Sequence, residues 1–90
     1  FALHQNFPNP FNPTTNIQFD LPSQEKVNIV IFDVMGRNIR SLMNENLNAG
    51  YHNIQWDAKN DLGESVSAGM YIYILNAGEH RSVKKMVLLK

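Results

Sequence analysis

The amino-acid sequence predicts an all-β domain, an antiparallel β-sandwich. Several short segments alternate apolar and polar residues with the period of two that a half-buried strand shows. Turn signals rich in glycine, proline and asparagine separate these segments at intervals of about 8–12 residues. No segment carries a sure helical pattern, so the strand pattern decides the fold class.

Composition narrows the possible functions. The chain has 90 residues, 43% of them hydrophobic, which suits one collapsed domain. Eight basic and eight acidic residues cancel, so neither nucleic acid nor anionic lipid is an expected partner. There is no cysteine and no apolar run near the roughly 20 residues of a membrane span. So small a chain leaves little room for a catalytic cavity, and we expect no enzyme activity and no cofactor.

The first 14 residues predict a stiff arm. Pro8, Pro10 and Pro13 fix their own φ angles and push each preceding residue toward extended backbone, so the segment is not helical. We expect residues 1–14 to pack on a single sandwich domain formed by residues 15–90.

The arm has two interpretations. In the favoured one, Phe7 and Phe11 close the end of the sandwich, because large aromatic side chains are mostly buried. In the other, the arm is a recognition segment, because pre-ordered proline-rich chain loses little entropy when a partner docks on it. The candidate recognition residues are Pro8, Asn9, Pro10, Phe11, Asn12 and Pro13.

Residues 15–21 and 27–32 predict the first two strands. The first alternates apolar with polar residues, and the second is apolar on both faces, which is typical of a central strand. A hairpin turn follows at Gly36 and Arg37, with the glycine supplying a positive φ. Residues 38–42 predict a strand, and the asparagine-rich residues after them predict a loop.

Residues 52–56 alternate again and predict another half-buried strand. The polar connection at 57–69 crowds acidic and amide side chains, and Asp57 and Asp61 give a weak alternative of Ca²⁺ binding. Their spacing does not follow the EF-hand pattern, so turn formation is the favoured role. The three histidines lie on separate elements and predict no zinc site.

Residues 70–75 and 81–89 predict the last two strands. Tyr71 and Tyr73 share one face of their strand, opposite Ile72 and Ile74. Exposed, the two rings would suit a polysaccharide; buried tyrosines with hydrogen-bonded hydroxyls are commoner in sandwiches. The predicted core side chains are Ile17, Phe19, Ile29, Ile31, Ile54, Trp56, Ile72 and Ile74.

The end of the chain is basic. No acidic residue follows Glu79, whereas Arg81, Lys84, Lys85 and Lys90 are positively charged. Such lysines can simply discourage edge-to-edge aggregation of strands, or they can flank a docking strand.

Several blocks of this sequence resemble one known family. Residues 5–15, QNFPNPFNPTT, resemble the QNYPNPFNPTT opening of the C-terminal sorting domains of type IX secretion cargo. Residues 27–37 are similar to that family's V-x-L-x-V-Y-D-x-x-G-R block, and residues 84–90 to its terminal KKMVLLK. Ala58 stands where the family often has glycine. The blocks between these two ends, such as residues 27–37, are also similar to the immunoglobulin-like domain of the flagellar hook-capping protein.

The resemblance implies a seven-stranded immunoglobulin-like or fibronectin-III-like sandwich at the C-terminus of a larger secreted protein. It implies a targeting role without catalysis, with the outer-membrane machinery of type IX secretion and its sorting peptidase as partners. The cargo would cross the inner membrane on a separate N-terminal signal, pass through the periplasm and reach the outer-membrane surface or the medium. The implied recognition residues are Lys84, Lys85, Met86, Val87, Leu88, Leu89 and Lys90.

Two other classes of function are compatible with the sequence. One is a carbohydrate-binding or adhesive module of a secreted enzyme, and the other is a structural scaffold domain. A sorting signal must finish its reading frame, and we expect Lys90 to end the final strand without a tail, which favours sorting.

Overall fold

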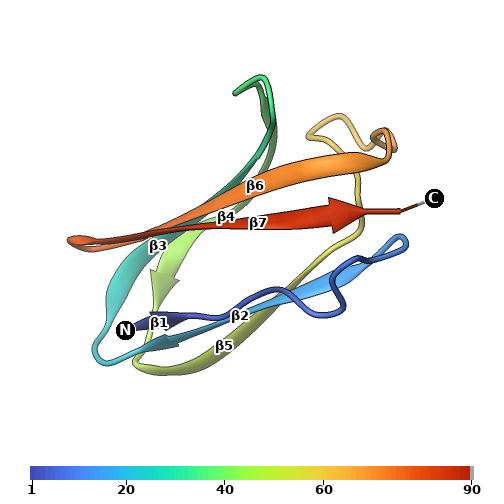
Figure 1. Ribbon diagram of the computed structural model, residues 1–90. Coiled ribbons are helices and arrows are strands. Elements are labelled where there is room, and N and C mark those ends of the chain that lie inside the picture. The colour runs from blue at the N-terminus through green and yellow to red at the C-terminus, as the bar shows by residue number, and fades with distance from the viewer. Residues whose placement is uncertain (90) are drawn as a thin grey trace.

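The computed structural model describes residues 1–89, which form seven strands in two antiparallel sheets (Figure 1). One sheet has the order β1-β2-β5 and contains β1 (Ala2–Leu3), β2 (Thr15–Leu21) and β5 (Gly50–Trp56). The other has the order β4-β3-β6-β7 and contains β3 (Glu25–Asp33), β4 (Asn38–Leu47), β6 (Gly69–Ala77) and β7 (His80–Leu88). The predicted β-sandwich is confirmed.

The hydrophobic core lies between the two sheets. Trp56 from β5 is fully buried, and its ring lies 5.4 Å from that of Tyr71 on β6 and 5.8 Å from that of Phe11 in the arm. The other core side chains come from the strands, in which every second side chain faces the opposite sheet. The fully buried strand residues include Ile17, Phe19, Val27, Ile29, Ile31, Tyr73, Leu75 and Met86.

Three predicted core residues are not fully buried. Ile72 and Ile74 are half-buried and lie on the outer face of β6, whereas Tyr71 and Tyr73 face the core. The strand is apolar on both faces, so its alternation does not identify the inner one. Ile54 is also half-buried, because β5 is an edge strand of the smaller sheet. Tyr71 and Tyr73 therefore cannot form the polysaccharide platform that exposure would have offered.

Strand β4 extends beyond the predicted end. It continues through Leu47, where the sequence predicted a loop. Glu45 and Asn44 lie opposite Val27 and Asn28 of β3. Pairing with β3 therefore satisfies the backbone hydrogen-bonding groups of this segment, although asparagine has a low propensity for strands. Two register shifts in the β3–β4 pairing mark bulges within this hairpin.

Ala58 has φ +61 and is buried after the end of β5. This left-handed conformation is one that glycine adopts without strain and alanine does not. The backbone conformation at position 58 therefore favours glycine, the residue that the family described above often has there.

Candidate functional site

Strand β7 forms one edge of the four-stranded sheet, where its neighbouring strand is β6. Met86 and Leu88 are buried in the core, whereas Lys85 and Leu89 are exposed and Val87 is half-buried. The buried pair anchors the strand in the fold, so the part of β7 that a partner can reach most directly is its outer face. Lys90 lies outside the described residues.

The two lysines of β7 lie on opposite faces of the sheet. Lys84 is directly opposite the buried Tyr73 on β6, so it projects from the inner face and is half-buried. Lys85 is opposite Ile72 and is exposed on the outer face. The recognition role predicted for both side chains is therefore geometrically open to Lys85 and restricted for Lys84.

The proline-rich arm covers the C-terminal half of the β7 edge. Phe11 donates its N–H to the carbonyl of Val87 at 2.9 Å, and its own carbonyl accepts the N–H of Leu89 at 2.8 Å, in a parallel bridge. The Val87 N–H is donated to Asn9 Oδ1 at 2.9 Å, and the Gln5 side chain donates to the carbonyl of Lys85 at 2.7 Å. The two segments predicted to act in recognition thus lie side by side.

The two aromatic residues of the arm have different environments. Phe11 is 2% exposed and packs against Trp56, so it closes the end of the sandwich as predicted for both rings. Phe7 is 77% exposed and does not plug the core. The difference follows from Pro8 and Pro10, which separate the two rings by a kinked segment.

A buried polar network holds the arm in place. The Tyr73 hydroxyl accepts the N–H of Asn6 at 2.8 Å and donates to the carbonyl of His4 at 3.0 Å. The Asn6 side chain donates to Thr15 Oγ1 at 2.9 Å, and this hydroxyl donates to the carbonyl of Pro8 at 2.8 Å. Burial raises the pKa of Tyr73 to about 12, although the Asn6 N–H opposes the shift.

Sequence reasoning missed Asn6, Thr15 and Tyr73 as a unit. The sequence shows only a polar residue on either side of the prolines, Asn6 and Thr15, and a tyrosine within an apolar strand. Because Asn6 and Tyr73 are 67 positions apart, only the tertiary fold brings them together.

The β3–β4 turn is built around Asp33. Its Oδ1 accepts the N–H groups of Met35 and Arg37 at 2.9 and 3.0 Å, and Arg37 Nε lies 2.7 Å from its Oδ2. The hydrogen bond from the Arg37 backbone N–H is the main cause that lowers the pKa of Asp33. Gly36 has φ +82 at the tip. These contacts give the turn a structural role.

In the 57–68 loop, the side chains of Asn60 and Asp61 accept hydrogen bonds from the backbone, whereas Asp57 is exposed. Asp61 Oδ1 accepts the N–H of Ser41 on β4 at 2.9 Å, and Asn60 Oδ1 accepts the N–H groups of Leu62 and Glu64, each at 3.0 Å. Within residues 1–89, no three histidine or acidic side chains are grouped as metal ligands would be. The same part of the chain has no helix long and apolar enough to cross a membrane.

Three solved structures are similar to this chain, which spans only a small part of the first two and about two thirds of the third. Latent PorU from Porphyromonas gingivalis aligns with 97% of this chain at 22% identity and TM-score 0.76, over 9% of its own length. PorZ of the same organism's type IX secretion system aligns with 99% at 16% identity and TM-score 0.66, over 12% of its length. FlgD from P. aeruginosa aligns with 88% at 18% identity and TM-score 0.59, over 67% of its length.

No curated protein matches the chain. A family model described as "secretion system C-terminal sorting domain" matches residues 5–89, from the arm to the residue after β7. The matched span includes both hydrogen-bonded segments of the candidate site. This chain therefore belongs to the family of C-terminal sorting domains, the non-catalytic signals of type IX secretion.

Proposed function

We propose that β7 and the arm segment at residues 9–11 together form the surface by which the outer-membrane secretion machinery binds this domain. The observation that carries the proposal is the pairing of Phe11 with Val87 and Leu89, which joins two segments that lie at opposite ends of the chain. A partner that contacts one segment contacts the other as well. Recognition then requires the folded domain and not a linear peptide.

The chemistry of this surface suits an acidic acceptor. Lys85 is exposed on the outer face of β7, with Arg81 four residues before it on the same face. No acidic residue occurs between Glu79 and the end of the chain. The exposed Leu89 adds apolar area beside these charges. Complementary charge steers association and selects the partner, and apolar contact adds affinity.

The domain acts as the C-terminal sorting signal of a larger protein. The parent protein crosses the periplasm, reaches the outer membrane and is delivered to the cell surface or the medium, where the sorting peptidase removes the domain. Any enzyme activity of the parent resides upstream of this chain.

The experiment is an export assay in a bacterium that has type IX secretion. The chain is fused behind a fluorescent reporter with an inner-membrane export signal, and the reporter is measured in periplasm, surface and medium. Lys85→Glu is expected to shift reporter into the periplasm. The matched control is Lys26→Glu, which reverses an exposed lysine on β3, two strands away from β7 and at the end of the sheet opposite to Lys85. We expect this variant to be exported normally.

The outcomes separate two errors. If Lys85→Glu is exported as well as the parent fusion, the lysine only guards the edge against aggregation and the proposed surface is wrong. If the intact fusion stays in the periplasm, the delivery route itself is wrong. Deletion of residues 86–90 is a weaker test, because it also removes Met86 and Leu88 from the core.

A further inference from the structure

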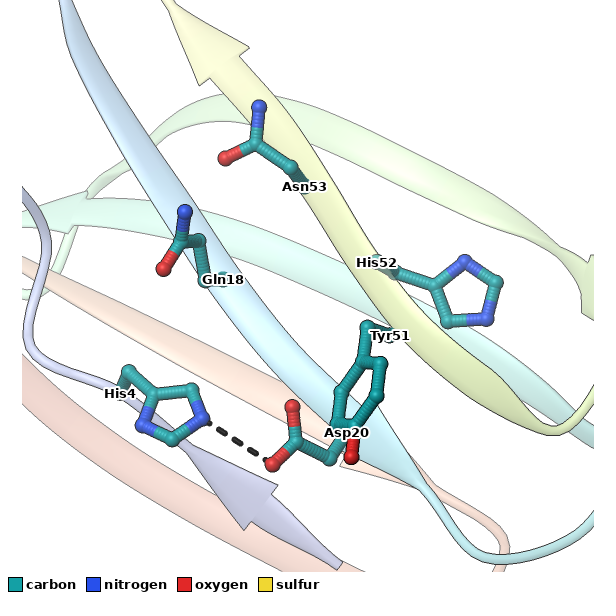
Figure 2. Close-up of a pocket in the computed structure, with 6 residues that line it drawn as sticks. All are labelled: His4, Gln18, Asp20, Tyr51, His52 and Asn53. Atoms are coloured by element: carbon teal, nitrogen blue, oxygen red, sulfur yellow. Dashed lines mark hydrogen bonds and ion pairs between the residues drawn. The ribbon is translucent and has the colours of Figure 1, made fainter.

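A shallow depression of about 450 Å³ lies on the outer face of the three-stranded sheet, on the side away from the core. Figure 2 shows the residues that line it: His4, Gln18, Asp20, Tyr51, His52 and Asn53. The depression is separate from the β7 edge, because β7 belongs to the other sheet.

Strand register gathers the side chains of this face. Asp20 of β2 is directly opposite Tyr51 of β5, and Gln18 is opposite Asn53. Directly opposite residues in an antiparallel pair project from the same face, and the alternate residues of β2 are buried in the core. His4 adds to the row, because its backbone N–H is donated to the carbonyl of Gln18 at 3.0 Å.

The polar groups here can both donate and accept hydrogen bonds. The amides of Gln18 and Asn53 each present a carbonyl oxygen and an NH₂ group. Asp20 presents a carboxylate, oriented by His4, whose Nε2 lies 3.1 Å from Asp20 Oδ2 (Figure 2). The Gln18 amide makes no hydrogen bond to any residue in the described part of the chain, so it is available to a ligand.

An aromatic ring stands at each end of this polar row. Tyr51 is 89% exposed beside Asp20. Phe7, which is 77% exposed, is directly opposite Asn16 in an isolated bridge and lies on the same face. Asp20 and Asn16 are about 13 Å apart along β2 at about 3.3 Å per residue. An extended ligand can therefore contact both rings while it crosses the amides.

We propose that this face binds a neutral saccharide chain laid along β2. A pyranose ring has an apolar C–H face, which packs on an aromatic ring, and a rim of hydroxyl groups, each able to donate and accept. Amides and a carboxylate between two exposed rings match that pattern. Tyr51 and Phe7 supply the packing surfaces, and Gln18, Asp20 and Asn53 supply the hydrogen bonds.

Other ligand classes fit this face less well. No lysine or arginine lines the depression, and the Asp20 carboxylate would repel phosphate or sulfate groups, which argues against nucleic acid and anionic polymers. A protein interface needs a buried apolar centre, whereas the centre of this face consists of amides.

The test is an NMR titration of the isotope-labelled 90-residue chain with linear cello-, manno- and malto-oligosaccharides. We expect the side-chain amide signals of Gln18 and Asn53 to shift for at least one of the three, with a dissociation constant on the order of 1 mM because the depression is open and shallow. The assay uses purified protein, so it is independent of export.

Matched variants identify the surface. Tyr51→Ala is expected to weaken binding about tenfold, while Tyr51→Phe retains it because the ring remains. Gln18→Met, which removes the amide at similar length, is also expected to weaken binding. Leu62→Ala alters an equally exposed side chain in the 57–68 loop and is expected to change nothing.

Two results overturn the proposal. One is the absence of any shift with all three oligosaccharides at concentrations about ten times the expected dissociation constant. The other is unchanged binding by Tyr51→Ala when buried Trp56 fluorescence shows that the variant is folded. If no oligosaccharide binds but Tyr51→Ala lowers reporter export, the face contacts protein instead and the saccharide proposal is wrong.

Discussion

The Tyr73 hydroxyl accepts a hydrogen bond from the backbone N–H of Asn6 at 2.8 Å, inside the core. Tyr73 belongs to β6, at the centre of the larger sheet, and Asn6 to the arm that reaches across from the smaller sheet. The position of the arm on the β7 edge therefore depends on a core side chain that the arm shields from solvent. The hydroxyl therefore links core packing to the candidate docking edge.

Tyr73→Phe tests that coupling. The substitution keeps the ring but leaves the buried Asn6 N–H and the His4 carbonyl without their partner. We expect the free energy of unfolding to fall by about 1–3 kcal/mol, the cost of an unsatisfied buried polar group. Urea denaturation followed by Trp56 fluorescence measures it. Tyr71→Phe loses a single hydrogen bond, to the Ser67 carbonyl, and is expected to cost less.

The same tyrosine predicts a loss of stability at alkaline pH. Burial raises the pKa of Tyr73 from 10.0 to about 12. As pH rises through this interval, the unfolded chain releases a proton that the folded chain retains, so unfolding becomes more favourable. We expect the stability advantage of the parent over Tyr73→Phe to shrink between pH 10 and 12. A constant difference across that interval would show that the hydroxyl is not shielded.

The strand pattern was largely predictable from sequence. Alternation at Ile17 and Phe19 identifies the inner face of β2, because the intervening residues are polar and the two faces differ. In β6 both faces are apolar, so alternation alone did not show that Tyr73 faces inward and Ile72 outward. The asparagines after Leu42 predicted a loop, whereas pairing with β3 holds the second half of β4 in a strand conformation.

The candidate site was predictable only in its parts. The sequence marks the prolines and the terminal lysines as separate unusual segments, and nothing local indicates that Phe11 pairs with Val87. Contacts between residues so far apart depend on the packing of two sheets, which no short-range pattern encodes. The sequence does not indicate the face proposed to bind saccharide for a similar reason, because Tyr51 and Asp20 become neighbours only through the β2–β5 register.

Trp56→Ala is expected to be severely destabilising. The side chain is fully buried, and its Nε1–H is donated to the carbonyl of Lys59 at 2.9 Å. Removing a buried tryptophan typically costs about 3–5 kcal/mol, a large share of the stability of so small a domain. Thermal unfolding followed by far-UV circular dichroism measures the loss. A melting temperature close to that of the parent would contradict the core assignment.

Asp33→Asn should show a stability difference that depends on pH. The pKa of Asp33 is lowered from 3.8, chiefly by the hydrogen bond from the Arg37 backbone, so folding favours the charged carboxylate. The carboxylate stabilises the fold above the unfolded-state pKa, and that contribution is lost as pH falls through the folded-state pKa. We expect Asp33→Asn to be less stable than the parent at neutral pH and equal to it in strong acid. A difference independent of pH would instead indicate altered turn geometry.

Phe11 and Phe7 offer a matched pair for testing the cover on the β7 edge. Phe11→Ala removes a buried ring from beside Trp56 and is expected to cost about 3–5 kcal/mol, whereas the exposed Phe7 can be replaced by alanine within about 0.5 kcal/mol. Loss of the Phe11 anchor should also loosen its main-chain bonds to Val87 and Leu89. An uncovered edge is a template for pairing with another chain, so Phe11→Ala should self-associate more readily than Phe7→Ala.

Hydrogen exchange distinguishes loosening of the edge from general unfolding. In Phe11→Ala, the amide of Leu89, which bonds to the Phe11 carbonyl, should exchange faster by a larger factor than that of Tyr73, within the sheet. In Phe7→Ala both amides should exchange as in the parent. If Phe11→Ala accelerates the two amides equally, the ring stabilises the domain as a whole. The arm would then have no separate role at the edge, and the proposed docking surface would reduce to β7 alone.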